Sequence, residues 1–224
     1  MFALVLVLGL AVGYLMEKVS YKLVQSRTDA KIAQRLSNGA VHTAIWMGTN
    51  CAVWLAIWHF CGTSLYAIEI AIIASICIML SAIDILIRKI PNELLAALFI
   101  VHLIVLLLGQ RYAELPSYLL GAAVGLLLFL FPALFKKGGV GLGDVKLASA
   151  VGFILALNDF LASVILMAAF LLVYAAYLII SKKGGLKSKV ALGPFIAASM
   201  VATMVFTALT SHGPFEYFTR MLAG

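Results

Sequence analysis

The sequence predicts an all-α protein, a polytopic bundle of about eight transmembrane helices. Hydrophobic residues make up 64% of the 224 residues and charged residues only 11%, whereas about a quarter of the residues of an ordinary soluble domain are charged. The mean hydropathy is +1.12, and apolar runs near the roughly 20-residue length that spans a bilayer recur along the chain. No repeat or soluble segment interrupts them, so we expect residues 1–224 to form a single integral membrane domain.

Eight apolar segments are the expected spans. They lie near residues 1–17, 43–61, 65–84, 93–109, 117–135, 145–158, 160–180 and 190–211. The first has no basic region before it and no small-residue cleavage site, so we interpret it as a retained span and not as a signal peptide. The sixth is short for a full crossing, which predicts a tilted helix or a start below the membrane surface. In the fifth, Gly121 and Gly125 form a GxxxG pattern that predicts close helix packing, either within the fold, which we favour, or in a dimer.

The basic residues predict how the chain crosses the membrane. Fourteen of the 16 lie in or beside alternate connections: residues 18–42, the turn after the third span, and the connections before the sixth and eighth spans. The positive-inside rule therefore places these connections in the cytoplasm and both termini outside. Loops facing anionic lipid also account for the net charge of +7, so we expect the lipid bilayer as a partner and no nucleic acid.

The other polar residues predict no metal ion and no cofactor. The four histidines are scattered over both predicted sides of the membrane and share no ligand spacing. The three cysteines show no CxxC spacing and are expected to pack within spans. The acids of the predicted outer loops are expected to be merely solvated: Glu69, Glu114, Asp159 and Glu216.

Two aspartates differ from these acids, because each lies at the predicted cytoplasmic margin of a span. Asp84 ends the third span in MLSAIDILIRKIPNELL, and Asp144 opens the sixth in GVGLGDVKLASAVG. A carboxylate near lipid is costly and usually faces a cavity or a partner. The alternative is that each aspartate only marks a helix end and pairs with a nearby cation, Arg88 or Lys146.

The sequence before Asp144 favours a functional site. It contains four glycines: Gly138, Gly139, Gly141 and Gly143. Glycine permits backbone angles that are closed to other residues, and irregular backbone at membrane depth occurs where it lines a wet cavity or is buried in protein. We therefore expect this loop to dip into the membrane, present Asp144 and leave room for a substrate strand.

Two carboxylates that share one proton can hydrolyse a peptide bond. The ionised one takes a proton from water, and the protonated one donates to the scissile carbonyl. Asp144 opens a helix, where the dipole favours an anion, whereas Asp84 ends one. We therefore expect Asp84 to be the more often protonated partner.

Taken together, these motifs resemble the type IV prepilin leader peptidases, a family of GxGD-type membrane aspartyl proteases. The resemblance rests on Asp84 with the downstream Ile90-Pro91-Asn92, on Gly141-Leu142-Gly143-Asp144-Val145-Lys146, and on Leu192-Gly193-Pro194-Phe195. It is good from about residue 66 to 210 and weak over residues 1–60, where Glu17 stands in place of the usual asparagine.

The resemblance implies an aspartic endopeptidase of the plasma (inner) membrane. It would cleave the short basic leader from prepilin or pseudopilin precursors of type IV pili or protein secretion at the cytoplasmic face, with Asp84 and Asp144 as the catalytic pair. It implies a substrate-binding role for the neighbouring motif residues: Pro91, Asn92, Gly141, Gly143, Lys146, Gly193 and Pro194. Three cytoplasmic acids could attract a basic leader or be merely solvated: Glu17, Asp29 and Glu93.

The sequence departs from the family pattern in one respect, and it leaves two candidate functions besides the peptidase. Many members of the family carry a cytoplasmic insert with two CxxC pairs, associated with N-methylation, whereas residues 18–42 contain no cysteine. A four-thiolate zinc site cannot form there, so we do not expect methyltransferase activity. The other functions are a proton- or cation-coupled transporter using the same aspartates, although such sites usually lie near the midplane, and a non-catalytic assembly protein.

Overall fold

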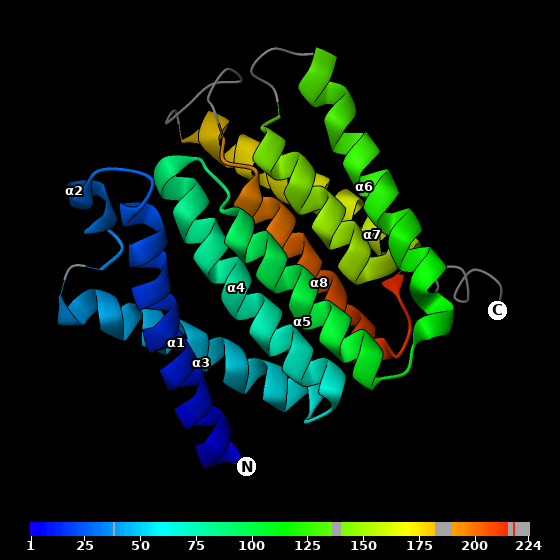
Figure 1. Ribbon diagram of the computed structural model, residues 1–224, viewed down its shortest axis with the longest axis horizontal. Helices are drawn as coiled ribbons and strands as arrows, with labels where there is room; N and C mark the ends of the chain where they lie inside the picture. Colours follow the sequence, from blue (N-terminus) through cyan, green and yellow to red (C-terminus); the bar gives the residue numbers. More distant parts are fainter. Residues whose placement is uncertain (38, 136–139, 182–189, 215–216, 218–224) are drawn as a thin grey trace. The chain divides into compact units, whose positions relative to one another are not determined.

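All regular structure is helical in the computed structural model, which describes residues 1–37, 39–135, 140–181, 190–214 and 217 (Figure 1). Six of the described helices are long and apolar enough to cross a membrane, and a further apolar helix is shorter. The predicted fold class, an all-α polytopic bundle, is confirmed. The chain divides into two compact units, Met1–Tyr112 and Ala113–Gly224. A single domain stays a prediction.

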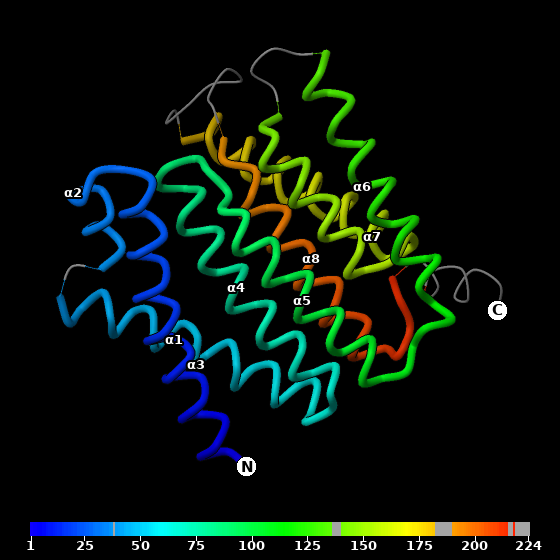
Figure 2. The backbone as a smooth tube through the Cα atoms, in the orientation of Figure 1, coloured from blue at the N-terminus to red at the C-terminus, as the bar shows by residue number. Residues whose placement is uncertain are grey.

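The first unit contains four long helices and one short one. These are α1 (Phe2–Gln25), α2 (Ala30–Ala33), α3 (Ala40–Cys61), α4 (Leu65–Ile87) and α5 (Asn92–Leu108). The long helices alternate in direction within the unit (Figure 2). As a result, α1 and α4 end, and α3 and α5 begin, at the same end of the unit.

Small residues bring α1 against α3. A Cβ added at Gly13 would lie 2.6 Å from the Met47 Cα, and one added at Gly9 would lie 2.8 Å from the Cys51 Cα. Each glycine is therefore required by the close approach of the second helix. Gly9 and Gly13 form a second GxxxG pattern, which the sequence analysis did not single out.

A buried carboxylate and an imidazole join α4 to α5. Glu69 is fully buried and His102 is 3% exposed, and Glu69 Oε1 lies 2.6 Å from His102 Nδ1. The expectation that Glu69 is solvated in an outer loop was therefore wrong. α4 begins at Leu65, capped by the Ser64 hydroxyl, which accepts from the Ala67 N–H. Glu69 consequently lies inside the helix and not before it.

The second unit contains α6 (Leu115–Phe135), α7 (Leu142–Ile180) and α8 (Gly193–Thr210), preceded by the 3₁₀ turn η1 (Tyr112–Glu114). The 39 residues of α7 do not form one rod, because Ala156 has non-helical angles (φ 61, ψ 177). An added Cβ at Gly125 would overlap the Ala148 carbonyl oxygen and lie 3.1 Å from Phe160 Cζ. In an unbroken helix residues 148 and 160 would be about 18 Å apart, so the chain reverses at Ala156, as Figure 1 also shows.

The reversal divides α7 into two segments. They correspond to the sixth and seventh spans that the sequence predicted. The break lies at Ala156, slightly before the expected boundary near 158–160. The first arm, residues 142–155, is about 21 Å long, which is short against a hydrocarbon core of roughly 30 Å. The predicted shortness of the sixth segment is therefore confirmed.

Glycines also set the packing of α6 on α7. Carbons added at Gly121 and Gly152 would each overlap the carbonyl oxygen of the other glycine. The prediction that the GxxxG pattern of Gly121 and Gly125 packs within the fold is confirmed.

At the far end of the unit, Thr207 Oγ1 of α8 donates to Asp159 Oδ2 at 3.2 Å, so Asp159 is not merely solvated as expected. Glu216 lies outside the described residues.

Candidate active site

Asp84 lies in the last turn of α4, where the sequence ends the helix abruptly. Arg88 adopts a left-handed conformation (φ 52, ψ 41), and its N–H donates to the Asp84 carbonyl oxygen at 2.8 Å. This left-handed cap satisfies a carbonyl that the helix end would leave without a partner. Pro91 then precedes α5, which begins at Asn92. The aspartate side chain is 5% exposed, so a buried carboxylate stands one turn before a sharp, proline-containing turn.

Asp144 lies in the first turn of α7. Its Oδ2 accepts a hydrogen bond from the N–H of Gly141, the N-cap residue, at 3.2 Å. A carboxylate there is stabilised by the positive end of the helix dipole. Val145, Leu147 and Ala148 are buried behind it, so apolar packing fixes this turn.

The glycines before Asp144 were expected to supply unusual backbone angles, but Gly141 acts differently. Gly141 has extended angles (φ −77, ψ 148) that any residue adopts, and in the described residues only Gly39 and Gly62 are glycines with positive φ. What Gly141 lacks is a side chain, because an added Cβ would lie 3.2 Å from Asp144 Oδ2. Gly138 and Gly139 lie outside the described residues, so the dipping of that loop stays a prediction.

Gly193 and Pro194 begin α8 at the end of the unit where α7 also begins. The Ser163–Ser199 hydroxyl bond (3.0 Å) and the Thr207–Asp159 bond show that α8 runs antiparallel to the second arm of α7. Pro194 occupies the first turn of α8, a position that needs no backbone N–H. Asp144 and the Gly-Pro element therefore share one end of the second unit.

The predicted site residues thus form two groups. Asp84, Pro91 and Asn92 gather at one end of the first unit. The second unit carries the others: Gly141, Gly143, Asp144, Lys146, Gly193 and Pro194. The pairing of Asp84 with Asp144 stays a prediction.

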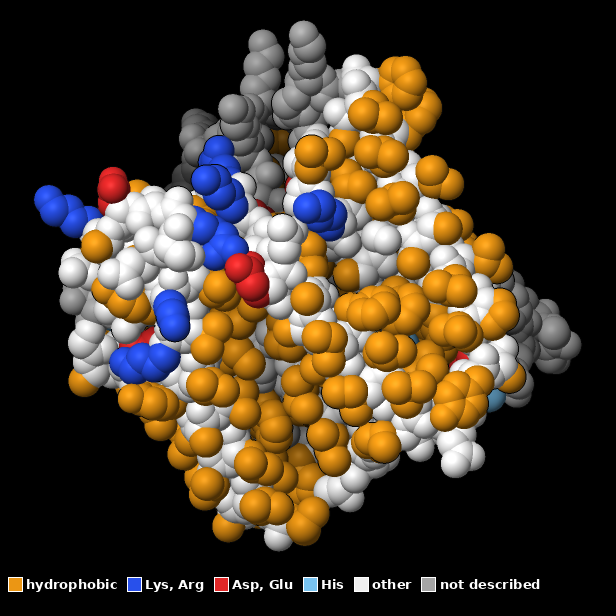
Figure 3. Space-filling view, in the orientation of Figure 1, with side chains coloured by type: hydrophobic (Ala, Val, Ile, Leu, Met, Phe, Trp, Pro, Cys, Tyr) orange, Lys and Arg blue, Asp and Glu red, His pale blue; other side chains and the backbone are white. Residues whose placement is uncertain are grey.

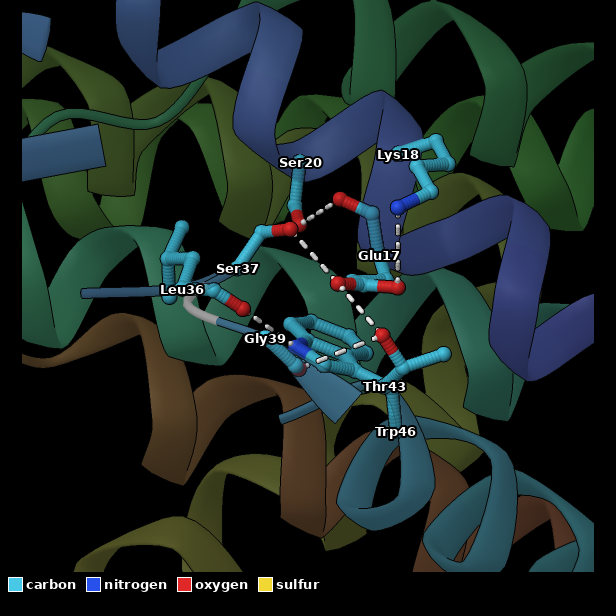
Figure 4. Close-up of polar contacts among 8 residues, drawn as sticks. All are labelled: Glu17, Lys18, Ser20, Leu36, Ser37, Gly39, Thr43 and Trp46. Atoms are coloured by element: carbon cyan, nitrogen blue, oxygen red, sulfur yellow. Dashed lines mark hydrogen bonds and ion pairs between the residues drawn. The ribbon is translucent and has the colours of Figure 1, made fainter. Parts of the chain in front are cut away.

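Sequence reasoning missed a polar cluster around Glu17 in α1 (Figure 4). Glu17 is fully buried. Its Oε1 accepts hydrogen bonds from Ser37 Oγ at 2.6 Å and from Thr43 Oγ1 at 3.0 Å, and Lys18 Nζ lies 3.6 Å from Oε2. Glu17 is therefore not a solvated acid, and we call it with Ser37 and Thr43 the clasp. The one available signal was a charged residue ending an apolar run, which does not reveal distant partners.

The clasp fastens residues 26–37, which connect α1 to α3 and which we call the strap. Ala33 and Leu36 of the strap are buried. At its other end, Arg27 Nη2 donates to both carboxylate oxygens of Glu93 in α5, at 2.8 and 2.6 Å. The strap therefore packs across the end of the first unit and reaches the helix that follows the Pro91 turn.

Basic side chains gather at this same end of the first unit. Figure 3 shows most of the visible Lys and Arg side chains toward the end of the first unit where α1 and α4 end, above a wide hydrophobic surface. Those of the strap, α1 and the α4–α5 turn are all at least partly exposed: Lys18, Lys22, Arg27, Lys31, Arg35, Arg88 and Lys89. Among the described residues, no three His, Cys, Asp or Glu side chains form a group that could hold a metal ion.

Residues 71–180 match the model of the Type IV leader peptidase family. That segment contains both Asp84 and Asp144. Over 148 residues the chain is also 28% identical to the prepilin leader peptidase/N-methyltransferase of Bacillus subtilis (strain 168). The two comparisons support the type IV prepilin peptidase family for this chain. The alignment covers 65% of this chain and 58% of the Bacillus protein, so the chain spans less than two thirds of that relative. No solved structure matches this chain.

Proposed function

We propose that this chain is a membrane aspartic endopeptidase that removes the short basic leader from prepilin or pseudopilin precursors. The observation that carries the proposal is the family match over residues 71–180, which includes both aspartates. Two further features support it. Asp84 is a buried carboxylate at a helix end, and Asp144 is fixed in a first helical turn by its bond to Gly141.

In the proposed reaction, the two carboxylates share one proton. The ionised Asp144 takes a proton from the attacking water, and the protonated Asp84 donates to the scissile carbonyl. The resulting tetrahedral intermediate collapses as Asp144 gives the proton it took from water to the leaving amine, while Asp84 takes back a proton from a hydroxyl of the intermediate, which restores the starting state. This assignment follows from the helix ends, because the first turn of α7 favours an anion and the last turn of α4 does not.

The precursor would approach from the bilayer, with its hydrophobic helix in the membrane and its leader on the cytoplasmic side. The gathering of cations at the Asp84 end of the first unit supports that orientation through the positive-inside rule. The motif residues that flank the aspartates would hold the substrate backbone: Pro91, Asn92, Gly141, Gly143, Lys146, Gly193 and Pro194. Methylation of the product is not part of the proposal, since residues 18–42 have no cysteine.

The test is cleavage of a prepilin precursor by purified protein in vesicles. We expect Asp84→Asn and Asp144→Asn each to reduce the cleavage rate by at least about 10³-fold, because general acid–base catalysis alone contributes about 10²–10⁴-fold. Asp159→Asn is the matched control, since Asp159 lies at the far end of the second unit and asparagine keeps an acceptor for the Thr207 hydroxyl. Undiminished cleavage by either mutant of the pair, at equal expression, would overturn the proposal.

A further inference from the structure

A cavity of about 230 Å³ opens in the first unit beside the strap. Its walls come from the strap, the first half of α3 and the last third of α4: Arg35, Leu36, His42, Ile45, Trp46, Thr49, Ile78 and Ala82. The polar members nearest the charged end are Arg35 and His42, and apolar side chains line most of the remainder. The cavity therefore runs from the level of the basic side chains into the apolar part of the helices.

The clasp gives this cavity a fixed wall. Glu17 holds Ser37 and Thr43, which lie on either side of the strap's junction with α3. Next to this contact, the Trp46 indole Nε1–H donates to the Leu36 carbonyl oxygen at 3.0 Å (Figure 4). Leu36 and Trp46 are both buried, so the strap residue that precedes the clasp is held against α3. The backbone of Arg35, the residue before Leu36, is thereby positioned beside the cavity that Arg35 lines.

The charges at the cavity favour an anion. Arg35 lies among the cations of this end of the unit, and the nearest acid of the clasp, Glu17, is already engaged by two hydroxyls and Lys18. The N-terminus of α3 adds the positive end of a 22-residue helix, and its cap residue Gly39 has no side chain to accept from the first N–H groups. Helix N-termini favour anionic ligands. A basic leader segment would be repelled here.

The apolar walls and the open side indicate that the anion carries a hydrocarbon chain. Ile45 is 60% exposed, and in a spanning helix an exposed isoleucine faces acyl chains. A small soluble anion has no hydrocarbon part to pack against Ile45, Ile78 and Ala82. A phospholipid matches both the basic end and the apolar walls of the cavity. Its phosphate reaches the basic side chains, and its acyl chain covers the apolar residues.

We propose that this cavity binds one anionic phospholipid, with its headgroup at Arg35 and an acyl chain along Ile45 and Ile78. The site is separate from the Asp84 carboxylate, which projects from α4 about 200° away from Ala82 at 100° per residue. The inference does not depend on the proposed peptidase activity. It assigns the strap a role, which is to form and position a lipid site.

Trp46 supplies the test, because it lines the cavity. In a protein whose other tryptophans are replaced (W54F and W58F), Trp46 is the only indole. This protein is reconstituted in phosphatidylcholine vesicles that contain a fixed fraction of either brominated phosphatidylglycerol or brominated phosphatidylcholine. We expect the brominated anionic lipid to quench Trp46 fluorescence at a several-fold lower mole fraction than the zwitterionic one.

Two variants decide whether the preference belongs to the cavity. Arg35→Gln is expected to reduce the phosphatidylglycerol preference about five-fold, the effect of one basic residue at an anionic surface. Lys31→Gln removes an exposed cation of α2 that does not line the cavity, and it is expected to retain the preference. Circular dichroism checks that each variant is folded.

Three results would overturn the proposal. They are equal quenching by the two lipids in the parent protein, an unchanged preference in Arg35→Gln, and an equal loss in both variants, which would indicate general surface charge. None of these readouts involves cleavage of a precursor. A failure of the lipid site is therefore distinguishable from a failure of the peptidase proposal.

Discussion

At the scale of single residues, the buried acids carry most of the new information. Glu17 and Glu69 were expected to be solvated, yet both are fully buried and partnered. Their partners lie 20 to 33 positions away in the sequence. Hydrophobic periodicity places a residue on a helix, but it does not identify such distant partners. The position of Asp84 at a helix end was predictable, because Pro91 follows and helices rarely continue through the residue before proline.

The stability of the protein should depend more on the acceptor oxygens of Glu17 than on its charge. We expect Glu17→Gln to lower the free energy of unfolding by about 1 kcal/mol, because Gln retains an acceptor for Ser37 and Thr43. Glu17→Ala should cost about 2–5 kcal/mol, since it leaves a cavity beside two unpaired hydroxyls. Thermal unfolding in detergent measures both changes. Equal losses in the two variants would contradict this account of the clasp.

The Glu69–His102 pair should behave as a unit. Removing one partner of this buried hydrogen-bonded pair leaves the other polar group unsatisfied and costs about 1–3 kcal/mol, whereas replacing both with apolar residues can be nearly neutral. We therefore expect Glu69→Leu and His102→Leu to destabilise the protein strongly, and the double variant E69L/H102L to recover much of the loss. Melting temperatures of the four proteins form the cycle, and simple additivity would refute the coupling.

At the scale of elements, the predicted apolar segments correspond to the observed helices, including two arms of α7. The boundary between the arms was less predictable. The sequence predicted a boundary near residues 158–160, whereas the reversal uses Ala156 at a positive φ, a conformation for which the sequence offers no glycine. The close helix contacts were half predictable: the GxxxG pattern in α6 was seen, and the one in α1 was not.

The glycine contact between α6 and α7 predicts a large effect from one added methyl group. A Cβ at Gly152 would overlap the Gly121 carbonyl oxygen, so the helices would have to separate. We expect Gly152→Ala to cost about 1–3 kcal/mol or more. Gly48→Ala is the matched control, because nothing lies within 4 Å of an added Cβ there and alanine favours a helix by about 1 kcal/mol. A melting temperature that falls in the first variant and not in the second supports the contact.

At the scale of the whole molecule, the chain divides into two units, and each contains one of the two aspartates of the predicted pair. The family match at residues 71–180 crosses the boundary at Tyr112–Ala113. The all-α bundle and the motif residues were predictable from composition and spacing. The strap and its clasp were not, because they depend on tertiary contacts of a short connection that has little pattern of its own.

The proposed pairing of the units can be measured directly. In a protein whose three native cysteines are replaced by alanine, the double variant D84C/D144C should form a disulfide under mild oxidation, because such a bond requires Cβ atoms about 3.5–4.5 Å apart. The variant D29C/D144C serves as the control, since Asp29 is not one of the proposed catalytic pair. A shift in gel mobility after proteolysis between the units reports the bond. Its absence under all conditions that preserve activity of the parent enzyme would argue against a shared site.

The buried carboxylate in α1 also has a consequence for synthesis. Glu17 leaves the ribosome before Ser37 and Thr43, so during that interval the first helix carries an acid with no internal partner. Placing such an acid in lipid costs several kcal/mol. We therefore expect α1 to stay at the insertion machinery until α3 has been synthesised, and the two helices to enter the bilayer together.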